Sequence, residues 1–200
     1  MSTKLYDKFT ICALVTHICF QAGAATERGR GMRAIEQVYV ATLASPWGEL
    51  VVMESARGVL RIDLPWSHGA RAMIVQGRVR VVSDALRTDI LAQLGQYFAH
   101  ARRAFDVPVD LRGTPFQLDV WRAAMRIPYG RTCAYGELAL ASGHPGAARA
   151  VGGAMGKNPL PILVPCHRVL AAHGIGGFGG AQGALACKRA MLAHEGVHNV

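Results

Sequence analysis

The chain of 200 residues is long enough for one domain or two small ones, and 51% of its residues are apolar, which excludes a disordered protein. Its formal net charge is +9, and the excess of Lys and Arg over Asp and Glu is one in residues 34–113 but five in residues 114–200. This uneven charge indicates a polyanionic partner, although a soluble basic protein without such a partner would have the same charge. Five cysteines without framework spacing argue against a disulfide-stapled secreted protein and favour the reducing cytoplasm.

Residues 1–33 precede the first strand-like pattern. Lysines near the start, an apolar run at 9–20 and small residues after it have the outline of a signal peptide, but Asp7 and His17 weaken this interpretation. The run is too short to span a bilayer as a helix, and we expect no membrane partner. We interpret residues 1–33 as a poorly ordered extension, with a native start at Met32 as an alternative.

Residues 34–111 form the first predicted domain. Two or three antiparallel strands joined by tight turns are predicted, at 37–43, 49–54 and 59–64. Apolar residues then recur four apart from Leu86 to Phe98, which predicts a helix over 84–103. This half is a small α+β domain without a cluster of reactive residues.

Residues 112–200 form the second predicted domain. Thr114 is a good helix N-cap with Pro115 at the first helical position, and an apolar face is predicted to follow at Phe116, Val120, Trp121 and Met125. Three more helices are predicted at 135–142, 147–155 and 183–194. The first two of these, with a turn at 143–145 between them, have the pattern of a helix-turn-helix. The expected fold class is therefore α+β, with an antiparallel sheet followed by a mostly helical domain.

The predicted helix at 147–155 has an unusual composition. It reads AARAVGGAM, with one charge among very small side chains. A helix that reads the major groove displays several long polar side chains, and this one does not. Two glycines destabilise a helix, so their presence indicates a close approach of its backbone to a groove or to another helix.

The run at 158–169 reads NPLPILVPCHRV and places a thiol, an imidazole and a guanidinium side by side. A thiol reacts as its thiolate, and neighbouring cations or imidazoles lower its pKa, so Cys166 is a candidate nucleophile. Cys166 and His167 can cooperate only if the chain turns there or a water bridges them, and Pro165 favours such a turn. The alternative is an inert cysteine in the core.

This run resembles the active-site signature of the O6-alkylguanine-DNA alkyltransferases, and the resemblance extends from about Thr114 to Gly196, more weakly back to about Val40. It implies that Cys166 irreversibly accepts the alkyl group of O6-alkylguanine, and of O4-alkylthymine, in double-stranded DNA. The protein would act once, as a monomer, with the target nucleotide flipped out of the helix and without a cofactor.

The resemblance also implies roles for single residues. In catalysis, His167 acts as a water-mediated base for Cys166, and Glu195 orients His167. The residues expected to contact DNA are Tyr135, Arg149, Ala148 and Gly152, with Arg149 filling the space left by the flipped nucleotide. The residues expected in the base pocket and its loop are Asn158, Val169, Phe178 and Gly179, with Asn158 bracing the cysteine segment.

Four of these residues also have an ordinary structural interpretation. Tyr135 would be a core aromatic, Arg149 a surface phosphate contact, Asn158 a turn former and Glu195 an exposed charge at a helix end.

Two regions depart from the family pattern. The family usually has tyrosine at the position of Phe178, and the loop at 174–188 differs in length on both sides of it. Some members bind zinc in the amino-terminal domain, but the aligned positions hold Glu36, Ser55 and Leu60, so we expect no zinc. Cys12, His17 and Cys19 lack a matching second pair of ligands and do not predict a metal site either.

Three other functions stay open. A lesion-binding protein would bind alkylated DNA and leave it unchanged; relatives of that kind lack the cysteine. A helix-turn-helix regulator would prefer one DNA sequence. A cysteine hydrolase would turn over an ester or peptide many times.

Overall fold

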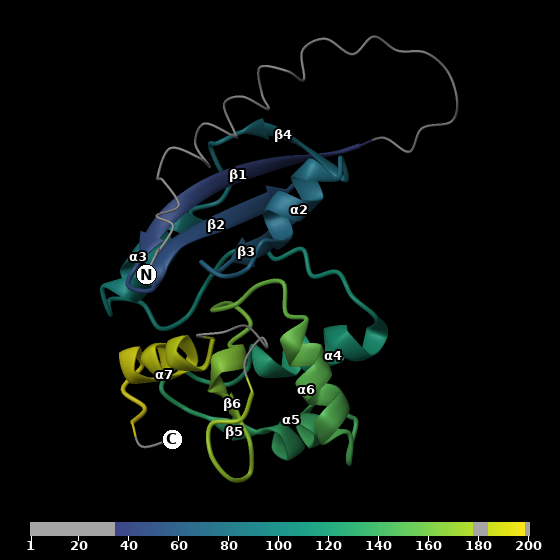
Figure 1. Ribbon diagram of the computed structural model, residues 1–200, viewed down its shortest axis with the longest axis vertical. Coiled ribbons are helices and arrows are strands. Elements are labelled where there is room, and N and C mark those ends of the chain that lie inside the picture. Colours follow the sequence, from purple (N-terminus) through teal and green to yellow (C-terminus); the bar gives the residue numbers. More distant parts are fainter. Residues whose placement is uncertain (1–34, 178–183, 199–200) are drawn as a thin grey trace, which may run out of the picture.

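A four-stranded sheet forms the amino-terminal half of the protein (Figure 1). The computed structural model describes residues 35–177 and 184–198, so the predictions for residues 1–33 and for Phe178 and Gly179 lie outside the described residues. The strands are β1 (Glu36–Ser45), β2 (Gly48–Ser55), β3 (Gly58–Asp63) and β4 (Val79–Ser83), in the order β3-β2-β1-β4. β1, β2 and β3 pair antiparallel, which confirms the predicted strands, whereas β4, which was not predicted, runs parallel to β1.

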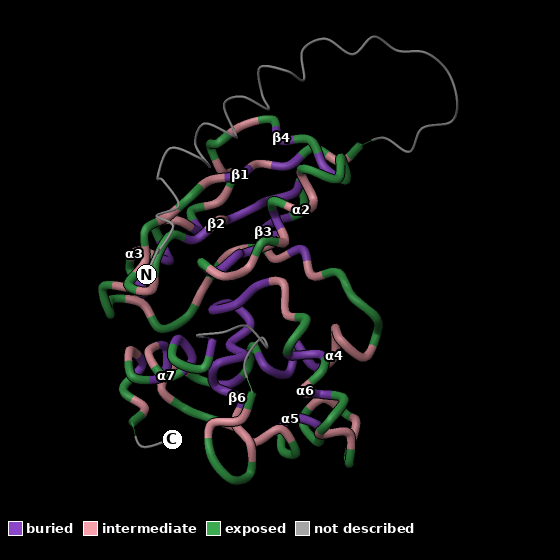
Figure 2. The backbone as a smooth tube through the Cα atoms, in the orientation of Figure 1, coloured by how far each residue is buried: buried purple, intermediate pink, exposed green. Residues whose placement is uncertain are grey.

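Buried residues lie along the strands and through the centre of the carboxy-terminal half (Figure 2), and they form two apolar clusters, one on each face of the sheet. One face carries Val38, Val40 and Met53, and the short helix α2 (Gly69–Val75) packs over it with Met73 and Ile74. The other face carries residues such as Leu50 and Val52 and packs against the carboxy-terminal half. The core is therefore continuous between the halves, and it ties the sheet to the elements that carry Cys166.

Helix α3 (Ile90–Phe98) begins later than predicted. Glu54, fully buried on β2, accepts hydrogen bonds from the Arg87 N–H at 2.6 Å, the Thr88 N–H at 3.3 Å and the Thr88 hydroxyl. These bonds hold the segment before Ile90 in a non-helical conformation. The predicted helical role of Leu86 is thus wrong, because a buried carboxylate outcompetes the local helical pattern.

The carboxy-terminal half is mostly helical, which confirms the expected α+β class. Its elements are α4 (Pro115–Ala124), β5 (Cys133–Ala134), α5 (Tyr135–Ala141), α6 (Ala148–Gly156), β6 (Val169–Leu170) and α7 (Ala184–His194). Thr114 caps α4 as predicted, because its hydroxyl accepts from the Gln117 N–H while the Gln117 side chain accepts from the Thr114 N–H. Met125 was predicted on the buried face of α4 but is 40% exposed, because α4 ends at Ala124.

A charged cluster includes Glu36 and Ser55, two of the positions at which no zinc was expected. The Ser55 hydroxyl donates to Asp110 at 2.6 Å, and Arg112 binds both Asp110 and Glu36. Leu60 lies apart from them, in the apolar cluster beneath α2. Within residues 35–177 and 184–198, no three His, Cys, Asp or Glu side chains form a group that could hold a metal ion. No helix in the same residues is long and apolar enough to cross a membrane.

We expect Glu54→Ala to lower the free energy of unfolding by about 1–3 kcal/mol, because the N–H groups of Arg87 and Thr88 lose their acceptor. Glu49→Ala is the matched control, because Glu49 is an exposed glutamate on the same strand and its loss should change stability by less than about 0.5 kcal/mol. Urea denaturation measures both. Equal stability of the two variants would contradict the assigned role of Glu54.

Candidate active site

A tight loop connects α6 to Cys166. The Asn158 side chain spans it, because its amide nitrogen donates to the Val164 carbonyl at 2.7 Å and its oxygen accepts from the Leu160 N–H at 2.9 Å. Ile162, within the loop, has a φ of 78°, a conformation that costs a non-glycine residue about 1–3 kcal/mol. Its side chain is buried in the core, so packing holds the strained backbone in place.

The chain turns at the cysteine. Cys166 begins the 3-10 turn η1 (Cys166–Arg168), and the Arg168 N–H donates to the Pro165 carbonyl at 2.9 Å. The expectation of a turn at the Cys166 and His167 pair is confirmed. It directs His167 into the protein interior and leaves the sulfur of Cys166 at the wall of a cavity.

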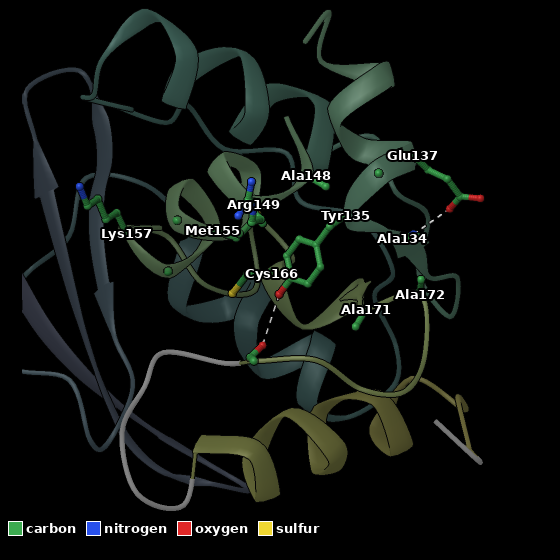
Figure 3. Close-up of a pocket in the computed structure, with 15 residues that line it drawn as sticks. Ala134, Tyr135, Glu137, Ala148, Arg149, Met155, Lys157, Cys166, Ala171 and Ala172 are labelled. Atoms are coloured by element: carbon green, nitrogen blue, oxygen red, sulfur yellow. Dashed lines mark hydrogen bonds between the residues drawn. The ribbon is translucent and has the colours of Figure 1, made fainter. Parts of the chain in front are cut away.

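This cavity has a volume of about 1090 Å³ and lies between the start of α5, α6 and the loop after β6 (Figure 3). Pockets for small molecules usually measure about 300–1,000 Å³, so the space is ample for a nucleobase. The predicted site residues that line it are Tyr135, Ala148, Arg149, Gly152 and Cys166. The predicted site residues that lie outside its lining are Asn158, His167, Val169 and Glu195.

Small residues shape the cavity wall. The Tyr135 hydroxyl donates to the Gly177 carbonyl at 3.3 Å (Figure 3). Gly176 has a φ of 71°, and a Cβ atom there would lie 3.3 Å from the Tyr135 ring, so the loop needs glycine at this position. On α6, Arg149 is exposed at the cavity, among Ala148 and Gly152.

Cys166 is buried, with 9% of the residue exposed. Burial raises its pKa, and the hydrogen bond from the Asn158 side chain and the charge of Lys188 offset this only in part. The lowered thiol pKa expected from the sequence is therefore wrong, because desolvation disfavours a charged sulfur more than the neighbours favour it. The resting thiol is neutral, and a base must remove its proton before it can react.

A buried charge cluster lies behind Cys166. Nε2 of His167 is 2.8 Å from Oε1 of Glu195, and Arg168 donates to both carboxylate oxygens at 2.8 Å. Burial acts to raise the pKa of Glu195, but hydrogen bonds from His167 and Arg168 outweigh it and hold that pKa well below its usual range. Burial lowers the pKa of His167, so its ring is neutral near pH 7. Its Nδ1 is buried and has no hydrogen-bond partner in the described part of the chain.

Glu195 accepts two further hydrogen bonds. The Tyr97 hydroxyl donates to Oε1 at 2.8 Å, and the Gly130 N–H donates to Oε2 at 3.1 Å. Tyr97 belongs to α3 in the amino-terminal half, where no reactive residue was predicted. Its contact joins residues 98 positions apart, so no local pattern could have indicated it.

Lys188 is the other residue that sequence reasoning missed. It is fully buried on α7, donates to the Val169 carbonyl at 2.6 Å and the Gly177 carbonyl at 3.2 Å, and lies over the Tyr135 ring. Burial lowers its pKa to about 8. One signal was available, because Lys188 occupies a helical position otherwise held by buried residues. Those residues are Ala184, Cys187, Met191 and Leu192.

Two family profiles match this chain. The profile described as "6-O-methylguanine DNA methyltransferase, ribonuclease-like domain" matches residues 38–111, and the one described as "6-O-methylguanine DNA methyltransferase, DNA binding domain" matches residues 115–197. A methylated-DNA–protein-cysteine methyltransferase of Mycolicibacterium paratuberculosis is 54% identical over 54% of this chain and 64% of the relative. The chain thus spans slightly less than two thirds of that relative. The constitutive methylated-DNA–protein-cysteine methyltransferase of Bacillus subtilis is 38% identical over 72% of this chain and 88% of the relative.

Solved structures show the same fold. The O6-methylguanine methyltransferase of Mycobacterium tuberculosis is 41% identical, with a TM-score of 0.68 over 79% of this chain and 92% of that chain. The structure of the M. tuberculosis protein in complex with DNA is 40% identical, with a TM-score of 0.68 over 80% of this chain and 92% of that chain. The profiles, the relatives and the arrangement of Cys166, His167 and Glu195 agree, and the chain belongs to the methylated-DNA–protein-cysteine methyltransferase family.

Proposed function

We propose that this protein repairs alkylated DNA by direct reversal, taking the alkyl group from O6-alkylguanine, and from O4-alkylthymine, onto Cys166. One observation carries the proposal: the Cys166 sulfur lines a cavity of about 1090 Å³, and a neutral, carboxylate-bound histidine lies directly behind it. The substrate is double-stranded DNA that contains the alkylated base.

The reaction begins with loss of the thiol proton. The proton passes from Cys166 through a bridging water to Nδ1 of His167. Nε2 is not the acceptor, because it keeps its own hydrogen and donates a hydrogen bond to Glu195. The thiolate then attacks the alkyl carbon in line, forming a carbon–sulfur bond as the carbon–oxygen bond to O6 breaks. Its electron pair leaves with guanine, which takes a proton from water. The positive charge of Lys188 favours the thiolate while it exists.

The product on the protein is a thioether. It has no acidic proton to lose, and its thiolate is a poor leaving group from an alkyl carbon, so no ordinary step regenerates the thiol. Each molecule therefore acts once. No metal or organic cofactor takes part in this scheme.

Helix α6 forms the side of the site that contacts DNA. The alkylated oxygen is hidden in the base stack, so the nucleotide must leave the helix, at a cost of a few kcal/mol. Ala148 and Gly152 let the α6 backbone approach the DNA closely, and Arg149 fills the vacated space. Tyr135 contacts the flipped base, and Asn158 and Val169 support the pocket from behind. The roles of Phe178 and Gly179 stay predictions.

The other functions fit the site less well. A protein that only binds lesions has no need for a thiol at the cavity wall or for a base behind it. A sequence-reading regulator needs long polar side chains on α6, where Arg149 is the only one. We further propose that the protein acts as a monomer in the cytoplasm and does not bind membranes.

We expect incubation with duplex DNA containing O6-methylguanine to make the wild-type protein heavier by one methyl group, located on Cys166. Cys166→Ala should leave the DNA methylated. Cys187→Ala is the matched control, since Cys187 is another buried thiol of the same core, and it should still accept the methyl group. Intact-protein and peptide mass spectrometry measure this. Demethylation of the DNA by Cys166→Ala would overturn the proposal.

We expect Arg149→Ala to slow methyl transfer from duplex DNA by about tenfold or more, because the flipped state loses part of its support and 1.4 kcal/mol corresponds to a tenfold rate. Transfer from free O6-methylguanine should stay nearly unchanged. Arg71→Ala removes the same charge from the exposed face of α2 and controls for overall electrostatics. Single-turnover kinetics on both substrates test this role. Equal losses of rate on duplex DNA and on the free base would show that Arg149 does not fill the space of the flipped nucleotide.

A further inference from the structure

Tyr97 connects the amino-terminal half to the reacting groups. It lies on α3, is fully buried, and donates its hydroxyl hydrogen to Oε1 of Glu195 at 2.8 Å. The same oxygen accepts from Nε2 of His167 and from Nη2 of Arg168, each at 2.8 Å. A single carboxylate oxygen therefore takes one hydrogen bond from the sheet-containing half and one from the histidine behind Cys166.

Aromatic rings surround the buried ring of Tyr97. The ring packs against Phe105 at 5.7 Å, Tyr129 at 6.0 Å and His194 at 5.0 Å between ring centres, and Nε2 of His194 is 3.0 Å from the Tyr97 carbonyl. Burial, together with the negative charge of Glu195, raises the pKa of the Tyr97 hydroxyl far above its ordinary value. Tyr97 is thus a permanent donor at any pH at which the protein works.

A donor on Oε1 changes how strongly Glu195 attracts the proton of His167. Each hydrogen bond to a carboxylate spreads its negative charge and makes it a weaker acceptor for the others. Without the Tyr97 hydroxyl, Glu195 would stabilise the protonated imidazolium form of His167 more strongly. The pKa of His167 would then rise, and less of the neutral base would be present near pH 7.

Other charged and titratable groups surround His167 and Glu195, and Tyr97→Phe leaves all of these residues in the protein. They are Tyr129 from the segment after α4, Cys166 and Arg168 from η1, and Lys188 and His194 from α7, with His100 stacked on His194.

We infer that Tyr97 is a positioning residue for methyl transfer, whose hydroxyl fixes Glu195 and thereby keeps His167 available as the base. The inference rests on the proposed function. It gives the amino-terminal half a part in the chemistry, where the sequence indicated only a structural role.

The test compares Tyr97→Phe with Tyr129→Phe. Both remove one hydroxyl from the same aromatic cluster, but the Tyr129 hydroxyl donates to the His194 carbonyl and does not touch Glu195. Single-turnover methyl transfer from duplex DNA containing O6-methylguanine is measured across the pH range in which imidazole titrates. The rate should rise with pH as His167 loses its proton. In Tyr97→Phe, we expect the midpoint of this rise to move up by about one pH unit, with a roughly tenfold loss of rate at pH values below the midpoint. At high pH the rate should approach that of wild type. Tyr129→Phe should keep the wild-type midpoint.

A second variant should shift the pH midpoint in the opposite direction. Replacing Tyr97 with 3-fluorotyrosine keeps the ring and the donor but makes the hydroxyl more acidic, so Glu195 becomes a weaker acceptor and the midpoint should move to lower pH. Urea denaturation of each variant measures its stability separately. A purely structural role would reduce the rate at every pH and leave the midpoint in place.

The outcomes separate the two proposals. If wild-type protein takes no methyl group from the DNA, the proposed function fails. If wild type reacts but Tyr97→Phe and Tyr129→Phe have the same midpoint, the function stands and the role of Tyr97 is overturned.

Discussion

Five hydrogen bonds converge on the carboxylate of Glu195, and the site depends on them. They come from three parts of the chain: Tyr97 of α3, Gly130 after α4, and His167 and Arg168 of the turn at the cysteine. Glu195 itself follows α7. Burying a carboxylate and a guanidinium together carries a large desolvation cost, and removing one partner of such a pair typically destabilises a protein by about 3–5 kcal/mol. The saturation of Glu195 by donors offsets that cost, and it fixes the turn that places Cys166 at the cavity.

This arrangement explains how a buried cysteine can be both stable and reactive. Burial keeps the resting thiol of Cys166 neutral, because the cavity region does not solvate a sulfur anion well. In the proposed mechanism, the neutral imidazole of His167 accepts the thiol proton, and Lys188 provides a positive charge for the thiolate that results. This mechanism thus activates the thiol through its neighbours during the reaction, and not through a permanently lowered pKa. The hydrogen bonds of Asn158 and the packing of Ile162 in the core hold the loop that carries Cys166 in place.

The sequence predicted those parts of the fold that local chemistry decides. Strand-forming residues between tight turns located β1 to β3, and Thr114 and Pro115 located the start of α4. Helix α3 was predicted too long, because the hydrogen bonds that the N–H groups of Arg87 and Thr88 donate to Glu54 arise only once the sheet has formed. β4 and α2, which have five and seven residues, were not predicted.

The candidate site could also be predicted only in part. The cysteine motif indicated the candidate nucleophile Cys166 and predicted the turn there, and the family resemblance pointed to Glu195, whose contact with His167 spans 28 positions. Tyr97 was hidden because, three residues after Leu94 on α3, it has the pattern of an ordinary core residue. Its hydroxyl finds Glu195 only through the packing of the two halves. The pKa of Cys166 was expected in the wrong direction, because sequence shows the neighbours of a thiol but not its desolvation.

In the proposed mechanism, Glu195 holds His167 as a neutral ring with its proton on Nε2, so that Nδ1 can take the proton of Cys166. Nuclear magnetic resonance of the His167 ring nitrogens at neutral pH determines which nitrogen carries the proton. We expect a protonated Nε2 and an unprotonated Nδ1 in the unmethylated protein. A doubly protonated ring, or a neutral ring with its proton on Nδ1, would contradict this mechanism.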